Sequence, residues 1–183
     1  HYKLLTYFID HGMTDVDISY NTNFSTLRYK SFDCIELWKK FKTVRIGASV
    51  DGMGTRGEYI RNGFDWRKFE DNIKRLRENL PHVDLYISCT LSIFNAMHMP
   101  DFHRYMIQKE YIKPGDWDVN ILLFPEYYRI QMLPIKLRIP FLKKYQEMIT
   151  MLQTVSGASR AESGYNGAYN AIKHAGNVDP EQL

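Results

Sequence analysis

Short polar side chains follow each of the four segments that read as strands. Asn23 closes the first, Ser49 and Asp51 close the second, Asn95 follows the third and Glu126 the fourth. Because ligands of parallel α/β folds bind beyond the carboxyl ends of the strands, we expect these side chains to gather at one edge. Hydroxyl, amide and carboxylate groups together suit a polar small molecule. The alternative is that Asn, Asp and Ser only make turns there.

The elements that must position these side chains alternate between strand-like and helix-like patterns. Strands are expected at residues 16–20, 43–50, 83–91 and 118–124, and helices at residues 4–9, 32–41, 65–80, 101–109 and 142–152. Strands separated by helices of this length pair in parallel through right-handed crossovers. Residues 120–124 are nearly continuously apolar, which predicts strands covered on both faces. The pattern therefore predicts an α/β fold with a parallel sheet, either a barrel or an open doubly wound sheet.

The C-terminal segment has a different character. Residues 156–183 are rich in Gly, Ser, Ala and Asn and hold few large apolar residues. A weakly apolar segment of this kind has little to bury, so it predicts a loosely structured tail after one domain spanning residues 1–155.

Composition narrows the class of protein. The 183 residues are 44% hydrophobic and 25% charged, which is ordinary for a globular domain. The 24 basic and 21 acidic residues are spread along the chain, so no nucleic-acid surface is expected. No apolar run approaches the roughly 20 residues of a membrane helix, and no signal peptide is visible, which favours a cytoplasmic protein without membrane contact. Cys34 and Cys89 form no C-x-x-C pair and are expected to be reduced, buried thiols.

Two further motifs bear on possible binding sites. His98 and His103 are five residues apart, a poor fit to one helical face, so no metal site is expected. The run Gly52-Met53-Gly54-Thr55-Arg56-Gly57 matches the G-x-G-x-x-G pattern of dinucleotide-binding turns, but the acidic residue expected at the end of the next strand is missing. This run supports an alternative function, a non-catalytic α/β module that binds a nucleotide or NAD.

Several short motifs occur in a characteristic order. They are Tyr20-Asn21-Thr22-Asn23, Ser49-Val50-Asp51-Gly52, Gly57-Glu58-Tyr59-Ile60-Arg61, Asn62-Gly63-Phe64-Asp65-Trp66, Ser92-Ile93-Phe94-Asn95, Phe102-His103-Arg104-Tyr105 and Pro125-Glu126-Tyr127-Tyr128. Over about residues 4 to 145, their order and spacing resemble radical S-adenosylmethionine enzymes of the SPASM/twitch group, in particular twitch-domain proteins.

The resemblance implies a fold and a chemistry. The chain would be the later part, strands three to six, of a partial (β/α) TIM-like barrel. Such enzymes bind S-adenosylmethionine and a 4Fe-4S cluster, cleave the cofactor to a 5′-deoxyadenosyl radical, and abstract a hydrogen from a substrate. The cysteine loop that holds the cluster is absent here, so we expect a catalytically silent fragment. Its partners would be the missing N-terminal half of the same protein and a small-molecule or peptide substrate.

The resemblance also implies roles for individual residues. Ser49 would hydrogen-bond the ribose hydroxyls of S-adenosylmethionine, with Asp51 orienting the site. Arg61 would face the methionine carboxylate, where its planar fork offers bidentate geometry. Asn23 would lie beside the substrate or the cofactor, and Asn95 completes the cofactor-binding set. A half-barrel also predicts that residues 16–20 form an unpaired sheet edge.

Overall fold

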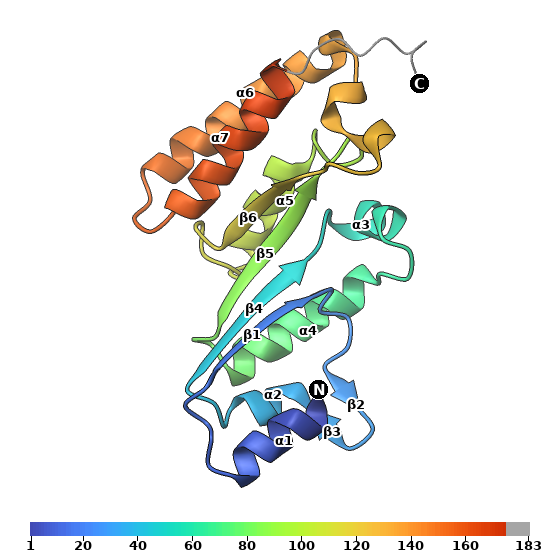
Figure 1. Ribbon diagram of the computed structural model, residues 1–183. Helices are drawn as coiled ribbons and strands as arrows, with labels where there is room; N and C mark the ends of the chain where they lie inside the picture. The colour runs from blue at the N-terminus through green and yellow to red at the C-terminus, as the bar shows by residue number, and fades with distance from the viewer. Residues whose placement is uncertain (175–183) are drawn as a thin grey trace.

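The computed structural model describes residues 1–174, which build an α/β fold around a four-stranded parallel sheet (Figure 1). Its strands are β1 (Asp17–Thr22), β4 (Thr43–Ser49), β5 (Asp84–Leu91) and β6 (Trp117–Ile121), in the order β1-β4-β5-β6. Every neighbouring pair is parallel, which confirms the predicted fold class. Among the described residues the sheet is open, with β1 and β6 at its edges, and no barrel is formed.

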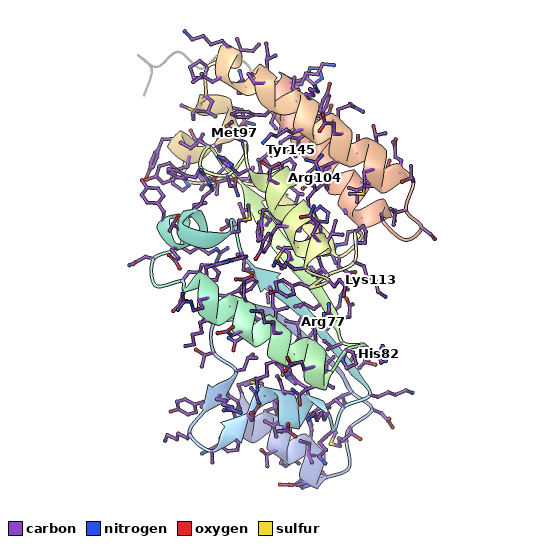
Figure 2. The ribbon with its side chains drawn as sticks, turned by 180° about the vertical axis from the view of Figure 1, so that it is seen from behind. Arg77, His82, Met97, Arg104, Lys113 and Tyr145 are labelled. Carbon is purple, nitrogen blue, oxygen red and sulfur yellow. The ribbon has the colours of Figure 1, made fainter. Side chains whose placement is uncertain are left out.

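Helices connect the strands and follow the sheet. They are α1 (Tyr2–Asp10), α2 (Cys34–Trp38), α3 (Gly54–Ile60), α4 (Trp66–Asn79), α5 (Met99–Gln108), α6 (Ile135–Gln153) and α7 (Ser159–His174), with short 3₁₀ turns η1 (Glu126–Tyr128) and η2 (Ile130–Met132) before α6. Helices α4 and α5 lie behind the sheet in Figure 1 and in front of it in Figure 2, so both cover the same face. No helix within residues 1–174 combines the length and the apolar character needed to cross a membrane.

The two faces of the sheet differ in chemistry. The face toward the helices carries Val44, Ile46, Ala48, Leu85, Ile87, Cys89 and Leu91, all buried. The opposite face, called here the polar face, carries Ser19, Asn21, Arg45, Ser49, Tyr86, Ser88, Thr90, Asp118 and Asn120, which the strand registers place side by side. Parallel sheets are usually covered on both faces. Within residues 1–174 the side chains of the polar face are half-buried or exposed, so the expectation of two covered faces is wrong. The polar alternation along β5 is the sequence feature that indicates it.

Local sequence signals explain the best-predicted helix. Asp65 is the N-cap of α4, and its side chain accepts a hydrogen bond from the Lys68 backbone N–H at 2.9 Å. Phe69, Ile73 and Leu76 recur on one side of the helix and are buried. Capping and periodicity agree here, so the predicted helix at residues 65–80 is confirmed.

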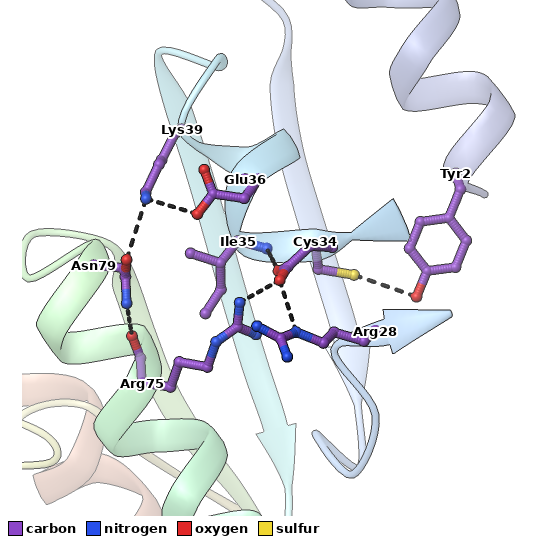
Figure 3. Close-up of polar contacts among 9 residues, drawn as sticks. Tyr2, Arg28, Cys34, Ile35, Glu36, Lys39, Arg75 and Asn79 are labelled. Carbon is purple, nitrogen blue, oxygen red and sulfur yellow. Dashed lines mark hydrogen bonds and ion pairs between the residues drawn. The ribbon is translucent and has the colours of Figure 1, made fainter. Parts of the chain in front are cut away.

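Residues 26–38 fold differently from the single helix expected at residues 32–41. A hairpin of β2 (Arg28–Tyr29) and β3 (Phe32–Asp33) precedes the short helix α2. Asp33 caps α2 by accepting a hydrogen bond from Ile35 N at 3.0 Å, and its carboxylate also binds Arg28 and Arg75 (Figure 3). Because Arg75 belongs to α4, this carboxylate joins the hairpin to the main helical layer.

The predicted loose tail is wrong for the described part of that segment. Residues 159–174 form α7, with Ala161, Tyr165, Ala168 and Ile172 buried. Small residues allow the close approach: a Cβ at Gly164 would lie 3.1 Å from the Val119 Cβ on β6. Glycine and alanine make residues 156–183 weakly hydrophobic, but in α7 these small residues allow the helix to pack closely against β6. Residues 175–183 lie outside the described part of the chain.

Three elements have bounds that differ from the predicted ones. Strand β1 extends through Asn21 and Thr22, which pair with Gly47 and Ala48 instead of forming a turn. Strand β6 ends at Ile121, and Leu123 and Phe124 are exposed beyond it. Helix α6 begins at Ile135 and includes Pro140. Both cysteines are buried and free, as predicted.

Candidate functional site

Three of the five predicted site residues meet at the carboxyl edge of the sheet. Asp51, two residues beyond β4, is 7% exposed. Its Oδ2 accepts a hydrogen bond from Arg61 Nε at 2.7 Å, and its Oδ1 accepts one from Thr90 N of β5 at 2.7 Å. The carboxylate therefore extends the pairing of β4 with β5 and fixes the arginine at the same point.

Asn95 holds this edge together. Its Nδ2 donates to the Asp51 carbonyl at 2.9 Å and to the Thr90 carbonyl at 2.7 Å, while its Oδ1 accepts from Ser92 N at 2.8 Å. The side chain is 1% exposed. With both amide hydrogens and the carbonyl oxygen bonded inside the protein, Asn95 acts as a positioning residue for the Asp51 loop.

Ser49 and Asn23 lie apart from this network. Ser49 is the last residue of β4, lies on the polar face, and stands opposite Ser88 in the register. Asn23 follows β1, where its Oδ1 accepts hydrogen bonds from Ser25 N at 3.2 Å and Ser25 Oγ at 2.8 Å. Asn23 thus makes a local turn, as the alternative interpretation of the strand ends predicted.

The polar face adds residues that the strand-end argument missed. The Tyr86 hydroxyl donates to Asn21 Oδ1 at 3.4 Å, and Asn120 Nδ2 donates to Ser88 Oγ at 3.0 Å. The signal that could have found them is the period-two recurrence of polar residues along β5, which places Tyr86, Ser88 and Thr90 on one face. The candidate site therefore includes the polar face of the sheet as well as the residues at the carboxyl edge.

A cavity of about 230 Å³ lies beside Asp51, between the start of α3 and the start of α5. Its lining includes Asp51, Arg56, Asn95 and His98. Burial, reinforced by the positive charges of Arg56 and Lys144, lowers the pKa of His98. The imidazole is thereby favoured in its neutral form, which leaves Arg56 as the cationic group of the lining.

The glycine run forms a tight link between β4 and α3. Gly54 has φ +58°, which favours glycine, and a Cβ at Gly57 would overlap the Gly52 carbonyl oxygen. The strand, glycine turn and helix follow one another as a dinucleotide-binding pattern requires, whereas β5 ends at Leu91 without the acidic residue.

The chain does not offer the ligands of an iron–sulfur cluster. Cys34 contacts the Tyr2 hydroxyl at 3.5 Å (Figure 3), whereas Cys89 lies in the core beneath Asn95. Burial, with a further contribution from the Asp51 charge, raises the pKa of Cys89, so its thiol is held protonated. Within residues 1–174 no group of three or more His, Cys, Asp or Glu side chains is arranged to hold a metal ion. Two separated thiols do not fit a cluster that needs three thiolates.

These features define an α/β protein with a parallel sheet, a polar face and, at the carboxyl edge, a network in which buried Asp51 and Asn95 hold the partly exposed Arg61. Comparison with protein-family models, with curated proteins and with solved structures finds no match to this chain.

Proposed function

We propose that the chain is part of a radical S-adenosylmethionine enzyme and forms a wall of its cofactor and substrate pocket. The observation that carries the proposal is an open, polar face on a parallel sheet, with Ser49, Asp51 and Arg61 at its carboxyl edge. An open sheet with one polar face is compatible with a segment of a barrel that encloses a ligand cavity, because polar side chains can line such a cavity. The resemblance of the motifs points to the same class.

Arg61 is the residue best arranged to hold the methionine carboxylate. Asp51 binds its Nε at 2.7 Å, and the side chain remains 33% exposed. A guanidinium anchored through Nε still offers its two terminal nitrogens for a bidentate carboxylate contact. Ser49, half-buried on the polar face, would supply the hydroxyl toward the ribose.

The cluster loop is assigned to a preceding part of the same protein, which would pair with the free edge of β1. This sequence lacks the three thiolates, so we derive no catalytic step for it, and the chain alone is expected to be inactive. Buried, unpaired thiols are typical of a reducing compartment, and the proposal places the protein in the cytoplasm. Its substrate would be a small molecule or a peptide that lies against the polar face.

The test is calorimetric titration of the chain with S-adenosylmethionine. We expect measurable binding that Arg61→Gln weakens about tenfold or more, because one charge-assisted contact is lost. Arg67→Gln is the matched control: Arg67 is exposed on α4 and should leave the affinity unchanged. Absence of binding, or equal affinities for wild type and Arg61→Gln, would rule the proposal out.

The glycine run favours one second candidate, a nucleotide- or NAD-binding module without catalysis. Its support is the close packing of Gly57 on Gly52 and the cavity beside them. This candidate predicts NAD binding that is lost in Gly54→Ala, together with no response to S-adenosylmethionine. Calorimetric titrations with S-adenosylmethionine and with NAD therefore distinguish the two functions.

A further inference from the structure

Two arginines from distant parts of the chain converge on one tyrosine of the polar face. The guanidinium carbons of Arg45, on β4, and Arg160, in the first turn of α7, lie 5.0 Å and 4.2 Å from the ring centroid of Tyr86. The Tyr86 ring rests on Gly47, where a Cβ would come within 2.6 Å of the tyrosine Cζ and hydroxyl. Glycine at position 47 thus allows the Tyr86 ring to lie across the sheet. The ring makes a cation–π contact with each of the two guanidinium groups.

Each arginine is paired with one carboxylate, and each keeps donors to spare. Arg45 Nε lies 2.9 Å from Asp84 Oδ2, and Arg160 Nη2 lies 2.9 Å from Asp118 Oδ2. A guanidinium carries five N–H donors, so one such contact leaves most of them for another acceptor. The side chains of Arg45 and Arg160 are 48% and 38% exposed, which keeps those donors accessible.

Charge decides which anion fits. Two arginines and two aspartates give a local sum of zero, so a single negative charge is accommodated more readily than the double charge of a phosphate. The guanidinium fork also matches a planar carboxylate. Hydrogen-bonding groups continue from this point across the sheet to the last residue of β4, since Asp118, Ser88 and Ser49 stand opposite one another on three neighbouring strands.

We propose that the polar face binds a small molecule with a carboxylate group, anchored by Arg45 and Arg160 beside the Tyr86 hydroxyl. Neighbouring strands are about 4.8 Å apart, so Asp118 and Ser49, two strands apart, are separated by about 10 Å. A ligand held by its carboxylate at Arg160 would reach Ser49, the last residue of β4, if it were about 10 Å long. Its assignment as the substrate rests on the function proposed above, whereas the carboxylate site stands on the geometry alone.

The test follows the arginine Nε–H signals by NMR while the chain is titrated with N-acetyl-L-alanine. We expect the Arg45 and Arg160 signals to shift along one saturating curve, and N-acetyl-L-alaninamide, which lacks the charge, to give no saturation. Inorganic phosphate at equal ionic strength should bind more weakly than the acid. Arg160→Gln should weaken binding of the acid about tenfold or more.

Arg28→Gln is the matched control, because Arg28 Nε makes the same 2.9 Å contact with an aspartate, Asp33, on the distant β2–β3 hairpin. It should leave the binding curve unchanged. If Arg160→Gln disturbs the fold, Arg160→Lys keeps the charge without the fork and should still weaken binding several-fold. Equal responses to the acid and the amide, an Arg28 signal that follows the same curve, or unchanged binding in both Arg160 variants would overturn the proposal.

Titration of the same variants with S-adenosylmethionine separates this proposal from the previous one. Arg160→Gln should keep its cofactor affinity, and Arg61→Gln should keep its affinity for N-acetyl-L-alanine. Cofactor binding without carboxylate binding overturns the carboxylate site alone. If N-acetyl-L-alanine binds but S-adenosylmethionine does not, the carboxylate site at Arg45 and Arg160 is supported. Its assignment as the substrate site of a radical S-adenosylmethionine enzyme is then overturned.

Discussion

At the scale of single residues, the buried imidazole of His103 links the stability of the fold to pH. It is fully buried and stacks on Trp117, with ring centroids 4.3 Å apart, and on Tyr165 at 5.6 Å. Burial lowers the pKa of His103 from 6.5 to about 3; the Pro114 backbone opposes this shift and the Arg104 charge adds to it. The folded protein therefore holds the imidazole neutral, while the unfolded chain binds a proton below about pH 6.5.

The stability of the fold should fall as the pH drops below 6.5, the unperturbed pKa of histidine. The slope for one such group approaches about 1.4 kcal/mol per pH unit. Urea unfolding at about pH 7, pH 6 and pH 5 measures it, and His103→Phe should flatten the profile because phenylalanine does not titrate. His11→Asn, at an exposed position, is the control. An unaltered slope in His103→Phe would assign the pH dependence to other groups.

The residues of the candidate site show which of its features can be predicted from the sequence alone. Asp51 and Arg61 were both identified, and the structure pairs them. The network role of Asn95 depends on Thr90 and Ser92 backbone atoms, which no side-chain pattern reveals. The sequence does not predict the convergence of Arg45 and Arg160 on Tyr86, because these two arginines are more than a hundred residues apart and meet only where α7 packs beside β6. Reasoning from the ends of the strands thus predicts residues at the carboxyl edge of the sheet, but it does not predict the polar face.

At the scale of elements, the junction between β4 and α3 has no room for a side chain at Gly57. A Cβ there would overlap the Gly52 carbonyl oxygen, so Gly57→Ala must push α3 away from the Asp51 loop. We expect a loss of about 1–3 kcal/mol in the free energy of unfolding and a displaced Arg61. Gly167→Ala on α7, where a Cβ meets nothing within 4 Å, should instead stabilise by up to about 1 kcal/mol. Urea denaturation compares the two; similar effects would contradict the packing argument.

Element boundaries were predictable where two local signals agreed. The N-cap Asp65 and the periodic Phe69, Ile73 and Leu76 defined α4 correctly. Helix α7 was missed because Gly164 and Ala161 look weak as core residues, although they let the helix approach β6 closely. The hairpin before α2 was missed because its two-residue strands carry no periodic pattern.

At the scale of the whole molecule, the two edges of the sheet are unequal. Among residues 1–174, strand β1 pairs with β4 alone through Asp17–Thr22, whereas β6 is flanked by α7, whose Gly164 lies against Val119. Native-state hydrogen exchange should show weaker protection in β1 than in β6, even though both are edge strands. Strong protection throughout β1 would instead indicate a self-contained fold and count against the half-barrel proposal. The position of β1 at an edge agrees with the expectation that the resemblance implied for residues 16–20.

That strand order has a consequence for how the protein is made. Leaving aside the β2–β3 hairpin, each strand joins the sheet beside the one synthesised just before it, from β1 to β4 to β5 to β6. A nascent chain leaving the ribosome can therefore enlarge the sheet by one strand and one covering helix at a time, without waiting for a distant partner. Within residues 1–174, helices α6 and α7 follow β6 and pack after that strand has emerged.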